Sequence, residues 1–173
     1  DGDLFRVMGV EPEGSPALPQ TDVQVLPTRT IYRFGNPKVS LVLTFLTPAL
    51  PSDLDVLSRP VTYITWEAVS VDGRPHTVQV DFQYSGLLAA DRPQQEVVWD
   101  RPQIEGLVVT RVGTKTQRVL ARRGDDLRID WGYIYLAAPA ESRTQIIKDG
   151  AVRFDLGQVV KKTAACYAML ACD

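Results

Sequence analysis

The sequence predicts an all-β fold, a two-sheet antiparallel β-sandwich with little or no helix. Roughly ten to twelve short runs of alternating or apolar residues follow one another at hairpin spacing, separated by Gly, Pro and Asp-Gly turns. No run keeps the 3.6-residue period of an amphipathic helix over about ten residues. The connections over 48–60 and 86–95 are long and unequal. Such connections suit strands that cross between sheets, and they favour a sandwich over a closed barrel.

The length of 173 residues suits one domain with a single core. Residues 1–21 are rich in Gly, Pro and Glu, and we expect them to form an irregular lead-in to a sandwich over 22–173. The first residues have the apolar, unpunctuated character of an internal segment. We therefore expect the sequence to be part of a longer, multidomain protein.

The first strong strand signal covers residues 39–46, after a turn at 35–37. Its apolar face consists of Val39, Leu41, Leu43 and Phe45. Prolines at 48, 51 and 60 prevent the next segment from continuing as a strand. We expect this segment to be an ordered crossover between sheets, with one helical turn that Ser52 caps.

The clearest predicted hairpin joins residues 61–71 to residues 76–85 through Asp72-Gly73, since both turn residues tolerate positive φ. The apolar face of its second arm consists of Val78, Val80, Phe82 and Tyr84. Their regular alternation with polar residues is the strongest signal of a half-buried strand in the chain.

Shorter strands are predicted over 96–100, 107–112, 117–121, 127–136, 143–147, 151–156 and 164–171. In the 127–136 run the alternation places one set of side chains on a common face, namely Leu127, Ile129, Trp131, Tyr133 and Tyr135. The preceding residues are expected to turn, which makes Asp125 and Asp126 a solvated pair and not the acid and base of an active site.

The charge balance excludes several classes of partner. With 19 basic and 21 acidic residues the chain offers little counterion release, so we expect no nucleic acid partner. No run approaches the ~18 consecutive apolar residues that cross a bilayer, so we expect no membrane partner. Without a P-loop, a dinucleotide-binding glycine motif or an EF-hand loop, we also expect no cofactor. The oligomeric state is left open.

Catalytic and metal-binding patterns are missing from the sequence. His76 is the only histidine and is expected at an ordinary edge-strand position, so neither a metal site nor a catalytic residue is assigned. Cys166 and Cys172 are expected to be buried core residues. On one strand they would lie ~20 Å apart, which is too far for a disulfide.

The remaining candidates are binding residues, namely Arg59, Asp81, Asp130 and Trp131. Asp81 and Asp130 lie on strong strand signals, opposite the apolar face. If another domain covers those faces, their carboxylates could pair with Arg59 or Arg128. Trp131 could join Trp66 and Trp99 in a sugar-stacking platform, although aromatic residues on alternating strands more often pack in the core.

Several segments together resemble the N-terminal β domain of the glutaminase A-like family, over roughly residues 22–172. They are Leu43-Thr44-Phe45-Leu46-Thr47-Pro48, Asp53-Leu54, Ser58-Arg59-Pro60-Val61-Thr62-Tyr63, Ser70-Val71-Asp72-Gly73, His76-Thr77-Val78-Gln79-Val80, Gly124-Asp125 and Arg128-Ile129-Asp130-Trp131-Gly132-Tyr133. The spacing of the Thr-Phe-Leu-Thr-Pro and Ser-Arg-Pro segments is the most specific part. Residues 81–86 depart from the more acidic pattern expected there.

The resemblance implies a secreted or periplasmic multidomain hydrolase, in which this β domain precedes a helical toroid domain. Fungal members hydrolyse L-glutamine to L-glutamate and ammonia. No catalytic residue of the family can be carried onto this sequence. We therefore expect a non-catalytic module that packs on the helical toroid of its parent chain, in the periplasm or outside the cell. The alternative is a carbohydrate-binding module of a polysaccharide-degrading protein.

Overall fold

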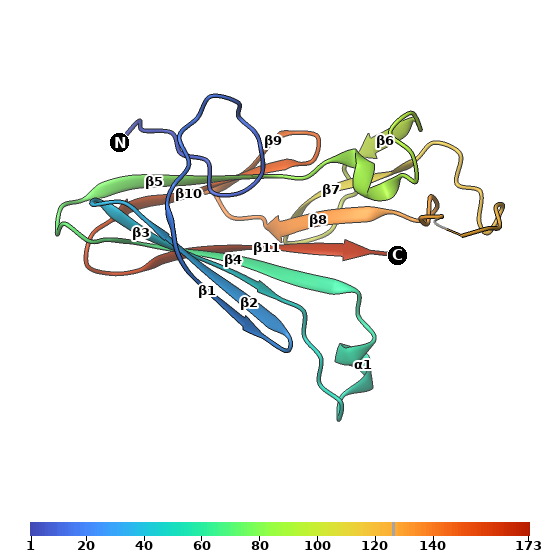
Figure 1. Cartoon of the computed structure of the whole chain (residues 1–173), viewed down its shortest axis with the longest axis horizontal. Helices are drawn as coiled ribbons and strands as arrows, with labels where there is room; N and C mark the ends of the chain where they lie inside the picture. Colours follow the sequence, from blue (N-terminus) through green and yellow to red (C-terminus); the bar gives the residue numbers. More distant parts are fainter. Residues whose placement is uncertain (126) are drawn as a thin grey trace.

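The computed structural model describes residues 1–125 and 127–173, and it confirms an all-β sandwich of two antiparallel sheets (Figure 1). The strands are β1 (Gln20–Leu26), β2 (Arg29–Gly35), β3 (Val39–Leu46), β4 (Val61–Ser70), β5 (His76–Gln83), β6 (Val97–Asp100), β7 (Leu107–Thr114), β8 (Ile134–Pro139), β9 (Thr144–Lys148), β10 (Ala151–Val159) and β11 (Ala164–Cys172). Among the described residues, helical structure is limited to the short turns α1 (Leu54–Leu57) and η1 (Gly86–Ala89).

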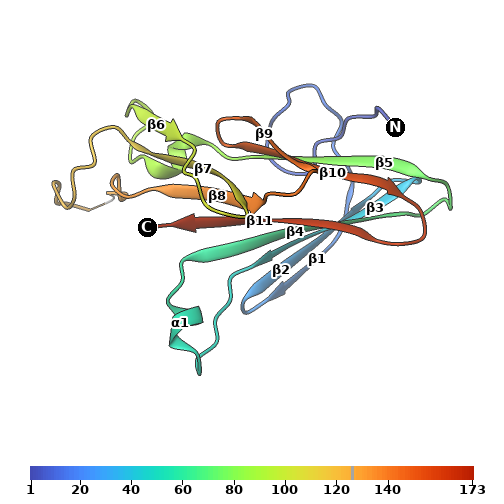
Figure 2. The same cartoon turned by 180° about the vertical axis from the view of Figure 1, so that it is seen from behind.

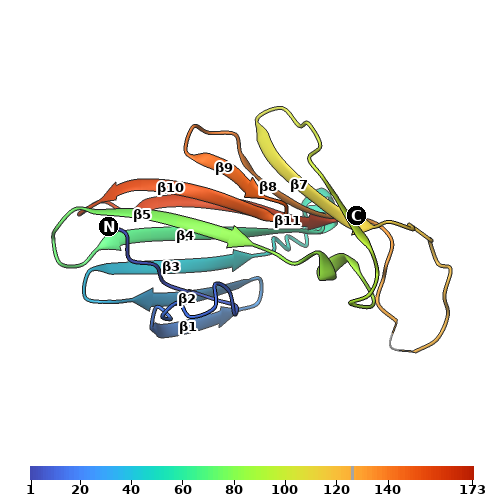
Figure 3. The same cartoon turned by 90° about the horizontal axis from the view of Figure 1, so that it is seen from above.

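The two sheets differ greatly in size. The large sheet has eight strands in the order β1-β2-β3-β4-β11-β8-β7-β6, and the small sheet has three in the order β5-β10-β9. β5 and β10 lie over β4 and β11 (Figure 3). On the β1 side the lead-in approaches the large sheet, and its residue Leu18 is buried in the core.

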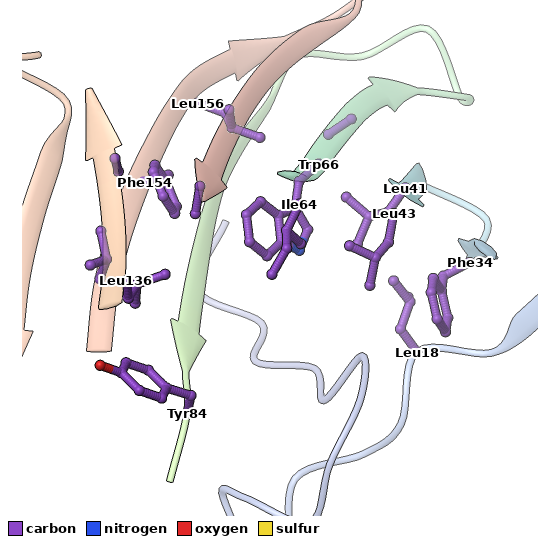
Figure 4. Packing of buried hydrophobic residues seen from close by; sticks show 14 of the residues in the cluster. Leu18, Phe34, Leu41, Leu43, Ile64, Trp66, Tyr84, Leu136, Phe154 and Leu156 are labelled. Atoms are coloured by element: carbon purple, nitrogen blue, oxygen red, sulfur yellow. The ribbon is translucent and has the colours of Figure 1, made fainter. Parts of the chain in front are cut away.

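One hydrophobic core fills the space between the sheets (Figure 4). Trp66 of β4 packs against Phe82 of β5 and Phe154 of β10, with ring centroids 5.3 and 5.5 Å apart. Other buried members are Phe34, Leu41, Leu43, Ile64, Ala68, Leu136, Leu156 and Ala168. The apolar faces predicted for 39–46 and 76–85 both point into this core, as the inner faces of a sandwich must.

The predicted hairpin between 61–71 and 76–85 is wrong. Both strands form, but β4 belongs to the large sheet and β5 to the small one. β4 already pairs with β3 on one edge and β11 on the other, so no edge is left for β5. The connection at 71–75 therefore carries the chain between the sheets, and the two strands bury their apolar faces against each other across the core.

Asp72 organises this connection. Its Oδ1 accepts hydrogen bonds from the Arg74 N–H at 2.9 Å and the Ser70 hydroxyl at 3.0 Å, and lies 2.9 Å from His76 Nε2. His76 is on an edge strand, as expected, but only 7% of its surface is exposed, which the sequence did not indicate. The Arg74 N–H and then His76 lower the pKa of Asp72 from 3.8 to about 2.

Replacing Asp72 by asparagine is expected to reduce the acid sensitivity of the fold. Because the pKa of Asp72 is lower in the folded than in the unfolded chain, its contribution to stability is present above about pH 4 and is lost as the pH falls toward about 2. Urea unfolding at about pH 5 and about pH 2.5 should therefore show a smaller loss of stability in Asp72→Asn than in the wild type. Equal losses would contradict this role.

Residues 47–60, which we call the arm, also differ from expectation. They connect β3 and β4, which are neighbours in the large sheet, so the predicted crossover between sheets is wrong here. The helical turn is present, but its N-cap is Asp53 and not Ser52, since Asp53 Oδ1 accepts the Val56 N–H at 3.0 Å. The arm projects away from the small sheet (Figures 1 and 2). The 86–95 connection does cross between sheets, as predicted.

The strand predictions for 117–121 and for the first half of 127–136 are wrong, because β7 ends at Thr114 and β8 begins only at Ile134. The expectation for Asp126 lies outside the described residues. Cys166 and Cys172 both lie on β11 as free thiols. Both were predicted to be buried in the core, and for Cys172, which is exposed, this prediction is wrong. No helix in the described part of the chain has the length and hydropathy to cross a membrane.

Candidate docking site

The predicted binding residues lie in three separate parts of the fold. Arg59 is exposed in the arm, and Asp81 is on β5. Asp130 and Trp131 belong to a long connection between β7 and β8, residues 115–133, which we call the apical loop. It projects beyond one end of the sandwich (Figures 1 and 3).

Asp81 forms a cross-strand ion pair on the outer face of the small sheet. Arg153 of β10 lies opposite it, and Arg153 Nε and Nη2 donate to Asp81 Oδ1 and Oδ2, each at 2.7 Å. The expected pairing with Arg59 or Arg128 is therefore wrong for Asp81. Both side chains are substantially exposed, so the pair is worth ~0.2–1 kcal/mol at most. We assign it to the small sheet and not to a ligand site.

Asp130 belongs to a network that ties the apical loop to the 86–95 connection. Asp130 Oδ2 accepts hydrogen bonds from Gln95 Nε2 at 2.8 Å and from Arg122 Nη2 at 3.1 Å. Its partner is thus Arg122, and not the expected Arg59 or Arg128. Gln95 Oε1 in turn accepts the N–H groups of Asp91 and Arg92, at 2.7 and 2.9 Å. One amide side chain therefore links two connections that are distant in sequence.

Asp91 is the most enclosed carboxylate of the network, with 6% of its side chain exposed. It accepts the Arg128 N–H at 2.9 Å and pairs with the Arg122 guanidinium. Together, the Arg128 N–H first and Arg122 second, these donors lower the pKa of Asp91. The carboxylates in turn raise the pKa of Arg122. Asp91 and Arg122 therefore stay charged over the physiological range, and their charge-assisted hydrogen bonds hold the loop.

Gln117 closes the base of the apical loop. Its Nε2 donates to the carbonyls of Thr114 at 2.8 Å and Gly132 at 3.2 Å, and its Oε1 accepts the Gly132 N–H at 2.7 Å. These backbone groups bond a side chain and not a neighbouring strand. Because Gln117 takes the hydrogen bonds that a neighbouring strand would form, the alternating residues before β8 form a loop and not a strand.

The apolar residues of the apical loop point outward. Val119, Leu120 and Ile129 are exposed, and Leu120 has 78% of its surface in solvent. Leu120 also has φ of 51°, in the left-handed region that a leucine rarely adopts. The loop thus exposes large apolar side chains among its charged ones, and apolar residues gathered in this way on a surface are typical of a contact site.

An open cavity of about 420 Å³ lies beside the network. Its lining consists of Arg92, Gln95, Thr114, Thr116, Arg118, Ala121, Arg122 and Asp130. Among the described residues of this lining, arginines outnumber carboxylates by three to one, which favours a negatively charged group in the cavity. Sequence reasoning pointed to Asp130 but missed Asp91, Gln95 and Arg122, because each lies alone in an irregular stretch without periodicity.

Comparison with known proteins assigns the chain to a family. Residues 28–165 match the family described as a domain of unknown function, DUF5127. This chain belongs to that family. The DUF5127 chain is also 26% identical over 140 residues to Glutaminase A of Aspergillus oryzae (strain ATCC 42149 / RIB 40), over 79% of its own length and 20% of the relative's. The resemblance to the glutaminase A-like family is confirmed, and the chain spans about a fifth of that relative.

A solved structure supports the fold of the DUF5127 chain. A protein described as a kojibiose phosphorylase from the human microbiome aligns with a TM-score of 0.50 and 10% identity, covering 84% of this chain and 17% of that one. At this identity the likeness extends to the sandwich architecture alone.

The tryptophans of the DUF5127 chain do not occupy a common exposed platform. Trp66 is 4% exposed and belongs to the core. Trp99 is partly buried and packs edge-on against Tyr84, with ring centroids 5.2 Å apart. Trp131 is partly exposed in the apical loop. Core packing therefore accounts for Trp66 and Trp99, which removes two of the three residues from the predicted sugar-stacking platform.

Two reactive side chains of the DUF5127 chain, His76 and Cys166, are buried and partly buried, respectively, whereas Cys172 is an exposed free thiol. Burial raises the pKa of the Cys166 thiol to about 12, which keeps it protonated and a poor nucleophile. Both ring nitrogens of His76 contact carboxylates, of Asp72 and Asp1. Among residues 1–125 and 127–173, no three His, Cys, Asp or Glu side chains gather as metal ligands would.

Proposed function

We propose that this chain is the non-catalytic N-terminal β-sandwich module of a glutaminase A-like amidohydrolase. In the parent protein, L-glutamine is hydrolysed to L-glutamate and ammonia, and the module packs on a helical toroid domain of the same chain. Support comes from the match to Glutaminase A, of which this chain spans only about a fifth. The resemblance also favours a periplasmic or extracellular location.

The observation that carries this proposal is the set of exposed apolar residues in the apical loop. Val119, Leu120 and Ile129 all face solvent in this loop, next to the enclosed Asp91 of the 86–95 connection that holds the loop in place. Burying such side chains against a partner contributes about 25 cal/mol per Å² of apolar area, from which the entropic and desolvation costs of association are subtracted. The network that shapes the loop also reduces the ordering cost of binding.

The charges near the loop indicate the kind of surface that it meets. Arg92, Arg118 and Arg122 line the adjacent cavity, and among the described residues of that lining Asp130 is the only carboxylate. A partner surface with an apolar recess beside acidic side chains would complement this arrangement. We assign that surface to the helical domain of the parent chain.

Ammonia release tests the proposed lack of catalysis. The full-length parent is expected to release ammonia from L-glutamine, and the isolated 173-residue chain is expected to release none. Two observations support this expectation: the Cys166 thiol is partly buried and stays protonated, and both ring nitrogens of His76 contact carboxylates. Ammonia from the isolated chain would overturn the proposal. Retention of the chain on a glycan array, with no ammonia from either protein, would favour the carbohydrate-binding alternative.

A further inference from the structure

The outer faces of the two sheets differ in chemistry. Inner residues Ile64, Trp66 and Ala68 of β4 lie in the core, so the residues between them face outward from the large sheet. Outward positions on β3, β4 and β11 carry a single charged residue, Glu67. On the small sheet the outward residues of β5 are all polar and exposed, namely Thr77, Gln79, Asp81 and Gln83.

The strand register aligns apolar side chains into a row across the large sheet. Leu46 of β3 lies opposite Tyr63 of β4, Tyr63 opposite Met169 of β11, and Met169 opposite Ala137 of β8. Tyr167 lies two residues before Met169 on the same face and is 41% exposed. Four neighbouring strands thus present a row of apolar side chains on the face of the large sheet that is turned away from the small sheet (Figure 1).

The arm extends this apolar surface. It leaves the large sheet between β3 and β4 and projects away from the small sheet (Figures 1 and 2). Its leucines Leu50, Leu54 and Leu57 are all exposed. The row and the arm therefore lie on the same side of the large sheet.

A sheet with two apolar faces needs a layer on each side. The small sheet supplies one layer, and amphipathic helices are well suited to supply the other because their apolar stripe packs flat on a sheet. Little charge lies on this face of β3, β4 and β11, which favours an apolar partner there, and the matched relative is about five times as long as the region that this chain covers.

We propose that helices of the parent's helical domain pack on the outer face of the large sheet, between the Leu46–Tyr63–Met169 row and the arm. This inference rests on the proposed function and adds to it the surface and the kind of element that covers it. The apical loop then contacts the same domain at the end of the sandwich.

Hydroxyl-radical footprinting of the full-length parent and of the isolated chain tests this surface. Tyrosine, methionine and leucine side chains report solvent access directly. The modification rates of Tyr167, Met169 and Leu54 are expected to fall at least about fivefold in the parent, because the helices exclude water from them. Ile147 is also 41% exposed, faces outward from the small sheet, and is expected to keep its rate in both proteins.

Matched variants separate docking from folding. Tyr167→Glu and Ile147→Glu replace apolar residues of equal exposure on opposite faces. Both are expected to shift the melting temperature of the isolated chain by less than about 3 °C, since each projects into solvent. In the parent, only Tyr167→Glu is expected to restore the fast modification of Met169.

The alternative outcomes are distinguishable. A rate decrease at Ile147 with none at Tyr167 would overturn this inference and leave the proposed function standing. No decrease at any of these residues, nor at Leu120, would contradict the proposed function itself. An isolated chain that sediments as a dimer, and that Tyr167→Glu makes monomeric, would show that a second copy covers this face and would overturn the inference.

Discussion

Replacing Trp66 by alanine is expected to lower the free energy of unfolding by about 3–5 kcal/mol. Trp66 reaches from the large sheet to Phe82 and Phe154 of the small one, with ring centroids 5.3 and 5.5 Å away. Its loss removes the largest side chain between the sheets and leaves a cavity that a two-layer fold cannot easily close. Urea unfolding measures the change, and thermal unfolding should shift by about 10 °C or more.

The companion variant is Trp66→Phe, which keeps an aromatic ring between the sheets and is expected to cost roughly half as much or less. Trp99→Ala is a second control, since Trp99 is only partly buried. A loss below about 1 kcal/mol in Trp66→Ala would mean that the two sheets do not pack through this residue.

The second large effect concerns docking. Leu120→Asp is expected to weaken binding of the isolated chain to the separately produced helical domain by about 100-fold, or about 2.7 kcal/mol. The variant removes an apolar side chain that is 78% exposed in the free module and forces a carboxylate into the interface. Isothermal titration measures the change in Kd.

Val10→Asp is the matched control for Leu120→Asp. Val10 lies in the lead-in and is also 78% exposed, so the two substitutions place the same charge on equally exposed positions. The control is expected to leave Kd unchanged. If both variants weaken binding equally, the effect comes from net charge and the apical loop has no special part in docking.

Local patterns predicted strands well and strand partners poorly. Alternation along 61–71 and 76–85 correctly indicated β4 and β5, but not that β3 and β11 occupy both edges of β4. That choice depends on β11, which lies about a hundred residues further along the chain. Pairing of this kind is a tertiary property, and a favourable turn dipeptide is insufficient to decide it.

In the apical loop, the local pattern failed to predict the secondary structure itself. The alternating residues of 127–133 predicted a strand, yet Gln117 and Asp91 bond the backbone that a partner strand would need. Asp130 was expected on a strand, but it lies in a loop, where Gln95 and Arg122 donate hydrogen bonds to its carboxylate. Such side-chain networks join isolated residues over 30 to 40 positions and leave no periodic signal.

The sequence of the arm indicated the family correctly, whereas the predicted path of the arm between two sheets was wrong. Its Asp53-Leu54 and Ser58-Arg59-Pro60 segments carried the family resemblance, and the family match confirms it. Its prolines correctly ended β3, but the arm returns to a neighbouring strand of the same sheet. The proposed packing of helices beside it gives these residues a role in the parent protein.

Titration calorimetry of the isolated chain against the separately produced helical domain of the parent tests the docking role most directly. The account predicts one-to-one binding with a negative heat-capacity change, because the apical loop and the outer face of the large sheet would bury apolar area. The account would be contradicted if no binding were detected and if the helical domain released ammonia at the same rate with and without the module.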